Sequence, residues 1–190
     1  MTSFSPRPVG PFLAGLVAIA AASGVQAQSF EEAKAAARRH EIEHQPPIAG
    51  VEQIAARNRD WSVNSFYRLW TGQGTERSSR WVIRRITRDD AGPRYADARD
   101  CPAVNEVLAA IEDLPPPIMD MPGIGREAPG EAEIVLDGVS QTLWARFARA
   151  GTGNASVNVE ITGNVNSPAA IWWGESLPKL DRCWASTLTP

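Results

Sequence analysis

Two histidines and a glutamate near the N-terminus are the residues whose types and spacing come closest to a catalytic centre. His40 and His44 are four residues apart, and Glu41 directly follows His40. On a helix, residues at i and i+4 share one face, so both imidazoles could bind one zinc ion while Glu41 deprotonates a zinc-bound water. A catalytic zinc site needs three protein ligands. The chain holds only these 2 histidines, so a distant acidic residue would have to complete the site.

Residues 40–44 resemble the H-E-x-x-H motif of the zincin metallopeptidases, and the resemblance covers no other part of the chain. It implies a zinc-dependent hydrolase that uses His40, Glu41 and His44. The alternative is a solvated surface helix with His44 near its C-terminal end, where a positive charge is favourable. Because the motif is flanked by two arginines and two prolines, we favour the surface helix. We accordingly predict no catalytic residue, no metal site and no cofactor.

Other catalytic arrangements find little support in the sequence. A Ser-His-Asp or Cys-His nucleophile would have to use His40 or His44, and no G-x-S-x-G motif is present. The glycines at 123 and 125 lie in a proline-rich stretch instead of between a strand and a helix, which does not fit a phosphate-binding loop. No pair of carboxylates is singled out by its surroundings. The sequence therefore favours a binding or protein-interaction module over an enzyme.

Two features predict where such a module would make contacts. The first is a cluster of arginines that could bind phosphate, carboxylate or lipid headgroups. The second is a pair of adjacent tryptophans that could stack on a sugar or anchor a protein partner. The possible interaction surface is formed by Arg80, Arg84, Arg85, Arg88, Trp172 and Trp173. The alternatives are a solvated sheet face for the arginines and core filling for most tryptophans.

The first 27 residues have the order of a secretory signal peptide. A leader carrying Arg7 precedes an uncharged apolar run, and Val25-Gln26-Ala27 follows as a small-residue cleavage site. The apolar run is too short to span a bilayer, so we expect no membrane span after cleavage. We predict an exported protein, in the periplasm or outside the cell. The mild net charge of −3 implies no particular partner. We expect an unknown envelope protein or a small ligand as the partner, and no nucleic acid.

The 2 cysteines, Cys101 and Cys183, are predicted to form one disulfide because exported proteins meet an oxidising environment. Cys101 begins the cleanest amphipathic pattern in the chain, a helix over Pro102–Leu114 with apolar residues at i, i+3, i+4, i+7 and i+10. Asp100 suits its N-cap, and three prolines end it. The bond would connect this helix to a C-terminal segment that is partly helical from Pro168 onward.

The remaining patterns divide the chain into three parts: a signal peptide at 1–27, an N-terminal surface helix within 28–47, and a single α+β domain at 48–190. A capping box at Ser29 starts the first helix, which we expect from Phe30 to about His44 and only loosely packed. A short helix is a weaker expectation for Val51–Arg57.

Period-2 alternation predicts strands in the rest of the domain. The predicted strands are Trp61–Trp70, Arg80–Arg88, Arg94–Ala98, Glu133–Leu136, Val139–Phe147 and Val157–Ile161. The first three follow one another as an antiparallel meander, and an Asp-Gly turn joins the next two. The fold class is therefore α+β, with an antiparallel sheet of about five or six strands, one packed amphipathic helix, a C-terminal helical segment and one disulfide.

Overall fold

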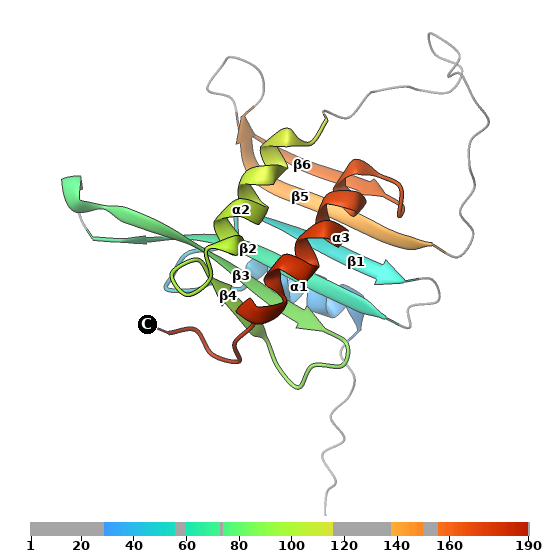
Figure 1. Ribbon diagram of the computed structural model, residues 1–190, viewed down its shortest axis with the longest axis horizontal. Helices are drawn as coiled ribbons and strands as arrows, with labels where there is room; N and C mark the ends of the chain where they lie inside the picture. The colour runs from blue at the N-terminus through green and yellow to red at the C-terminus, as the bar shows by residue number, and fades with distance from the viewer. Residues whose placement is uncertain (1–28, 56–59, 73, 116–137, 150–155, 190) are drawn as a thin grey trace, which may run out of the picture.

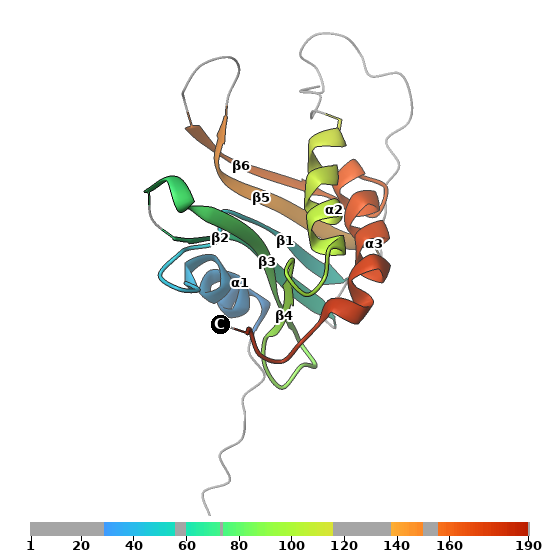
Figure 2. The same cartoon turned by 60° about the vertical axis from the view of Figure 1, so that its left-hand side comes forward.

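The computed structural model describes residues 29–55, 60–72, 74–115, 138–149 and 156–189. It confirms the α+β class. A six-stranded antiparallel sheet has the order β4-β3-β2-β1-β5-β6. Two helices, α2 and α3, cover one face of the sheet, and α1 covers the other (Figures 1 and 2). Within the described ranges, no helix is both long and apolar enough to cross a membrane.

The first four strands form a meander in which each strand pairs with the next. Their bounds are β1 Ala49–Ala55, β2 Trp61–Thr71, β3 Ser78–Thr87 and β4 Arg94–Asp97. A short 3-10 turn, η2 Gly74–Glu76, precedes β3. The helix predicted over Val51–Arg57 is wrong, because its described residues, 51–55, belong to β1, an interior strand between β2 and β5. Gly50 allows close packing there, since a Cβ atom would lie 2.8 Å from the Trp144 ring.

The connection after β4 carries the predicted amphipathic helix. Helix α2 spans Ala103–Ala109 and continues as the 3-10 turn η3 Ala110–Asp113, so the helical region is close to the predicted one. The predicted N-cap is wrong: Asp100 donates its backbone N–H to the Asp97 carbonyl in the preceding turn, and Pro102 occupies the N-cap position. The apolar face of α2 lies on the sheet, as its pattern predicted.

The last two strands extend the sheet beyond β1. Strand β5 Val139–Arg149 pairs antiparallel with β1, and β6 Ser156–Gly163 pairs with β5. Both agree with predicted strands. The predicted strand Glu133–Leu136 and its turn at Asp137 lie outside the described residues, as does the predicted signal peptide at 1–27.

Helix α3 Pro168–Leu180 crosses the sheet beside α2 and completes the main core. Ser167 caps its N-terminus by accepting from the Ala170 N–H. Trp173 is fully buried, and its ring centroid is 5.7 Å from that of Phe66 on β2. The buried core residues on this side are Val51, Phe66, Ile83, Ala96, Val104, Val107, Leu108, Trp172, Trp173 and Leu180.

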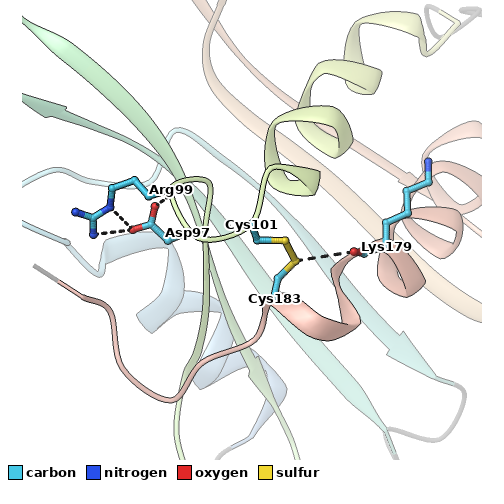
Figure 3. Close-up of a disulfide and its surroundings, with 5 residues drawn as sticks. All are labelled: Asp97, Arg99, Cys101, Lys179 and Cys183. Carbon is cyan, nitrogen blue, oxygen red and sulfur yellow. Dashed lines mark hydrogen bonds and ion pairs between the residues drawn. A yellow bond between two sulfur atoms is a disulfide. The ribbon is translucent and has the colours of Figure 1, made fainter.

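The predicted disulfide is present and joins the two helices of this layer (Figure 3). Cys101 lies just before α2, and Cys183 ends η4 Asp181–Cys183, the 3-10 turn that follows α3. Their Cα atoms are 5.6 Å apart, within the range of ordinary disulfides, and the bond closes a sequence separation of 82 residues. The C-terminal segment is thereby tied to the start of α2.

Helix α1 spans Phe30–Arg39, and its predicted capping box is confirmed: Ser29 and Glu32 exchange hydrogen bonds. The helix is shorter than predicted and is more firmly packed than expected of a surface helix. Ala33 and Ala37 are buried against Trp61 and Val63. Small alanine side chains let the helix backbone approach the sheet closely, which a pattern of large apolar residues would have prevented.

Candidate binding groove

The predicted tryptophan platform is not an exposed surface. Trp172 and Trp173 are only 7% and 0% exposed. Adjacent helical residues point about 100° apart, so the prediction assumed that one of the two would face solvent. Helix α3 instead lies in the corner between the sheet and α2. The Trp172 indole N–H donates to the Val107 carbonyl of α2 at 3.1 Å, while Trp173 packs on Phe66 of the sheet.

The predicted arginine surface is not one patch either. Strand alternation directs Arg80 and Arg84 toward the α1 face, whereas Arg85 lies on the face covered by α2 and α3. Arg80 is already neutralised, because it forms ion pairs with Glu43 at 3.0 Å and Asp97 at 3.4 Å. Arg88 is exposed and follows the last residue of β3. The cluster was close in sequence only, and the sheet separates its members.

The histidine motif lacks the geometry that a helical zinc site requires. Helix α1 ends at Arg39, and His40 has an extended backbone. Glu43 and His44 then form a tight turn with positive φ values, between Ile42 and Gln45. His40 and His44 therefore do not share a helical face, and the prediction that the helix reached His44 is wrong. Among the described residues, no three potential ligands are grouped closely enough to hold a metal ion.

The environment of His40 also favours a neutral imidazole. Partial burial lowers its pKa below the ordinary value, and the positive charge of Arg84 lowers it further. The Tyr67 hydroxyl donates to the His40 carbonyl at 3.2 Å. These contacts fix the C-terminal end of α1 on the sheet. They give the zinc-hydrolase alternative no specific support.

A different region offers a concave surface. A groove of about 540 Å³ lies between α2 and the sheet, beside the β2–β3 hairpin. Its lining is mostly apolar and is formed by Ala49, Phe66, Arg68, Trp81, Asn105, Leu108, Ala109, Ile111 and Glu112. This volume is within the usual range for ligand and anchor pockets, and the few polar groups at its edge could fix the orientation of an occupant.

One wall of the groove continues into a stack of arginine guanidinium groups and tryptophan rings. The Arg68 guanidinium lies 4.5 Å from the Trp70 ring and 5.8 Å from the Trp81 ring. Arg77 covers Trp70 as well, at 4.3 Å. We call Arg68, Trp70, Arg77 and Trp81 the arginine–tryptophan ladder. It runs from the groove, which Arg68 and Trp81 line, toward the turn that joins β2 to β3.

Two sets of hydrogen bonds position the ladder. Arg68 donates from Nε to the Ser79 hydroxyl on the neighbouring strand at 3.1 Å, which orients its guanidinium. Gln45 holds the backbone of Trp70: it accepts from the Trp70 N–H at 2.9 Å and donates to the Trp70 carbonyl at 3.3 Å. The Gln45 side-chain amide thus makes the two backbone hydrogen bonds that a neighbouring strand would otherwise make with Trp70. Trp70 remains 36% exposed, so its indole is accessible to a partner.

Comparison with known proteins does not add a family to this picture. No family model matches the chain. Neither a curated protein nor a solved structure matches it. Any functional conclusion therefore depends on the geometry above.

Part of this site could be predicted from the sequence. Trp70 and Arg68 alternate with the buried residues of β2, so their strand face was predictable. Their partners lie beyond the turn: Arg77 directly precedes β3, and Trp81 is on β3. Only the register between the two strands, with Arg68 opposite Trp81, brings the four residues into one ladder.

Proposed function

We propose that this protein is an exported, non-catalytic interaction module of the bacterial cell envelope, and that it binds a protein partner through the groove and the arginine–tryptophan ladder. The observation that carries the proposal is the exposed Trp70, held between Arg68 and Arg77 beside an apolar groove. Tryptophan and arginine are the residue types most enriched among the energetically dominant positions of protein interfaces.

The chemistry of the site restricts the partner. The groove floor, which includes Phe66 and Leu108, would accept one or two apolar side chains. Arg68 and Arg77 would bind carboxylates next to those anchors, because guanidinium groups pair well with carboxylates. The expected partner surface therefore combines an apolar anchor with acidic residues at its edge.

Export is part of the proposal, and two features support it. The N-terminal 27 residues have the pattern of a cleaved signal peptide. The Cys101–Cys183 disulfide is typical of an oxidising compartment such as the periplasm. Cell fractionation followed by N-terminal sequencing tests this part, with Gln28 as the expected first residue. A cytoplasmic protein that starts at Met1 would contradict it.

Site-specific photocrosslinking in living cells tests the interaction site. A photoreactive residue at Ile111 in the groove should form an adduct with a specific envelope protein, and the same residue at the 50% exposed Ile171 of α3 is the matched control. The Ile111 adduct should disappear when Arg68→Glu and Trp70→Ala are introduced. An identical adduct at both positions, or an adduct that is insensitive to the ladder variants, would refute the assignment.

The purified partner then allows a direct measurement. Trp70→Ala should weaken binding by about 10- to 100-fold, as expected for a central interface residue. The non-catalytic part of the proposal has its own test, which is metal analysis and hydrolase assays on the mature protein. Stoichiometric zinc together with hydrolysis that is lost in Glu41→Gln would overturn it.

A further inference from the structure

A second, smaller pocket lies at the opposite end of β2 from the groove. It encloses about 80 Å³ and opens between β1, the start of β2, the end of β3 and the start of β5. Its lining is formed by Gln53, Ala55, Asp60, Trp61, Ser62, Arg85, Thr87 and Val139. Unlike the groove, it is lined mainly by polar groups, and it includes one positive and one negative side chain.

The positive group, Arg85, is half-buried and has no hydrogen-bonded anion among the described residues. Its Nε atom is buried without an acceptor, and no carboxylate of the described residues lies within ion-pair distance. Its guanidinium lies 5.5 Å from the Trp184 ring, which holds it in place. Burial lowers the Arg85 pKa, and the charges of Asp90, Asp181 and Asp60 oppose this at longer range. A guanidinium in this position still lacks the close acceptor that would offset its desolvation.

The negative group, Asp60, lines the same pocket and also lacks a close cation among the described residues. Asp60 and Arg85 both border the cavity, yet they do not form an ion pair with each other. The neighbouring Thr87 is already used, because its hydroxyl donates to the Asp90 carboxylate at 2.9 Å and accepts from the Asp90 N–H.

The strands around the pocket leave further groups unsatisfied. Asn64 pairs with Arg85 across β2 and β3, and Gln141 pairs with Gln53 across β5 and β1. Both side chains are at most 5% exposed, and their Oδ1 and Oε1 oxygens receive no hydrogen bond in the described structure. In this part of the sheet, the Arg85 Nε donor and the Asn64 and Gln141 acceptor oxygens therefore all lack hydrogen-bond partners within the described residues.

We propose that this pocket binds a small zwitterion, an α-amino acid of the size of glycine, alanine or serine. Its carboxylate would pair with the Arg85 guanidinium and its ammonium group with the Asp60 carboxylate. The volume of the pocket agrees with the size of such a molecule. One water-sized group needs about 10–15 Å³, so a pocket of about 80 Å³ would hold roughly five to eight non-hydrogen atoms. A simple anion would leave Asp60 unpaired, and a simple cation would leave Arg85 unpaired. Only a molecule that carries both charges satisfies both.

Isothermal titration calorimetry on the full mature protein tests the proposal with glycine and alanine, and with acetate and methylammonium as half-ligands. The amino acids should bind saturably and at least about tenfold more tightly than either half-ligand. Arg85→Gln and Asp60→Asn should each weaken amino-acid binding by about tenfold or more. Arg84→Gln is the matched control, because Arg84 is adjacent in sequence but lies on the opposite face of the sheet.

The half-ligands distinguish the outcomes. Acetate that binds as tightly as alanine, with no effect of Asp60→Asn, would overturn the zwitterion assignment and indicate an anion site. The absence of saturable binding for every probe would overturn the site altogether. Asp60 is exposed, so Asp60→Asn should remain folded even if Arg85→Gln does not. NMR shifts of the Trp184 indole N–H on adding alanine give a second readout. Because this pocket is separate from the groove, its failure would leave the proposed partner interaction untouched.

Discussion

The two faces of the sheet hold their helices by different interactions. On the face covered by α2 and α3, the contacts are apolar, with Trp173 and Leu180 fully buried, and a disulfide joins the helical segments. On the other face, α1 contributes the small side chains of Ala33 and Ala37 and the partly buried Phe30, whose ring centroid is 6.2 Å from that of Trp61. It is held by Arg38, which donates two hydrogen bonds to the buried Glu52 at 2.5 and 2.9 Å, and by Lys34, 3.3 Å from the same carboxylate.

This difference follows from the size of the side chains available. Helix α1 has only ten residues, and two alanines with one partly buried phenylalanine bury less apolar area than the large side chains of the other face. Ion pairs supply the remaining stabilisation of the contact between α1 and the sheet. A buried carboxylate such as Glu52, however, stabilises the fold only while its partners are present. The α2–α3 face should therefore respond to changes in side-chain volume, and the α1 face to changes in charge and protonation.

Trp173→Ala should produce the largest loss of stability. Removing a fully buried indole should lower the free energy of unfolding by about 3–5 kcal/mol, because the surrounding core cannot fill the cavity. Urea denaturation measures this effect. Ile171→Ala on the exposed side of the same helix is the control, with an expected change within about 0.5 kcal/mol. Equal effects of the two variants would mean that α3 does not organise the core.

Loss of the disulfide should come next. The double variant Cys101→Ala, Cys183→Ala should lose about 2–4 kcal/mol, because the unfolded chain is no longer constrained over 82 residues. Thermal and urea unfolding of the oxidised protein and the variant give the comparison. Alkylation of the unreduced, denatured wild type should label no cysteine. Two labelled thiols would show that the bond does not form.

Glu52→Gln should destabilise the α1 face by about 2 kcal/mol, since one acceptor oxygen then replaces the two that Arg38 and Lys34 share. The matched control is Glu160→Gln, which removes an exposed carboxylate from the same Arg38, at an expected cost of less than about 1 kcal/mol. If the two variants had equal effects, burial would not distinguish these ion pairs and the comparison between the faces would fail.

The ionisation of Tyr67 should not affect stability near neutral pH, and its effect should be confined to alkaline pH. Burial of its phenol raises its pKa to about 12, from an unfolded value of about 10. Between these values the unfolded chain loses a proton that the native protein keeps, so stability falls as pH rises. The fall should be steeper than in Tyr67→Phe by up to about 1 kcal/mol per pH unit, and no such divergence should occur below pH 10. Parallel stability curves from pH 9 to 12 would contradict this account.

Several elements were predictable because their patterns are local. The apolar spacing of α2, the period-2 alternation of β2 and the capping box at Ser29 each depend on neighbouring residues alone. Strand β1 was missed because its alternation is hidden: Glu52 occupies a buried position, where pattern analysis expects an apolar residue. Its charge is tolerated because Arg38, fourteen residues away, and Lys34 both pair with it.

The predicted interaction surface failed for a related reason. Residues close in sequence were assumed to be close in space, but the pleat of β3 places Arg84 and Arg85 on opposite faces. The two adjacent tryptophans of α3 were expected to divide between core and solvent, and the corner between α2 and the sheet buries both. Conversely, the ladder joins Arg68 to Trp81 across thirteen residues, which only strand register could reveal.

The sequence by itself determined the α+β class, most of the elements and the pairing of the 2 cysteines, because these follow from local periodicity and from composition. The tertiary structure alone decided which charges are neutralised and which remain unpaired. Arg80 and Arg38 have carboxylate partners, whereas Arg85 lines a pocket and forms no ion pair with any carboxylate in the described ranges. The physical reason is that electrostatic and stacking energies depend on distances between side chains, and those distances are set by strand register and helix docking instead of by position in the chain.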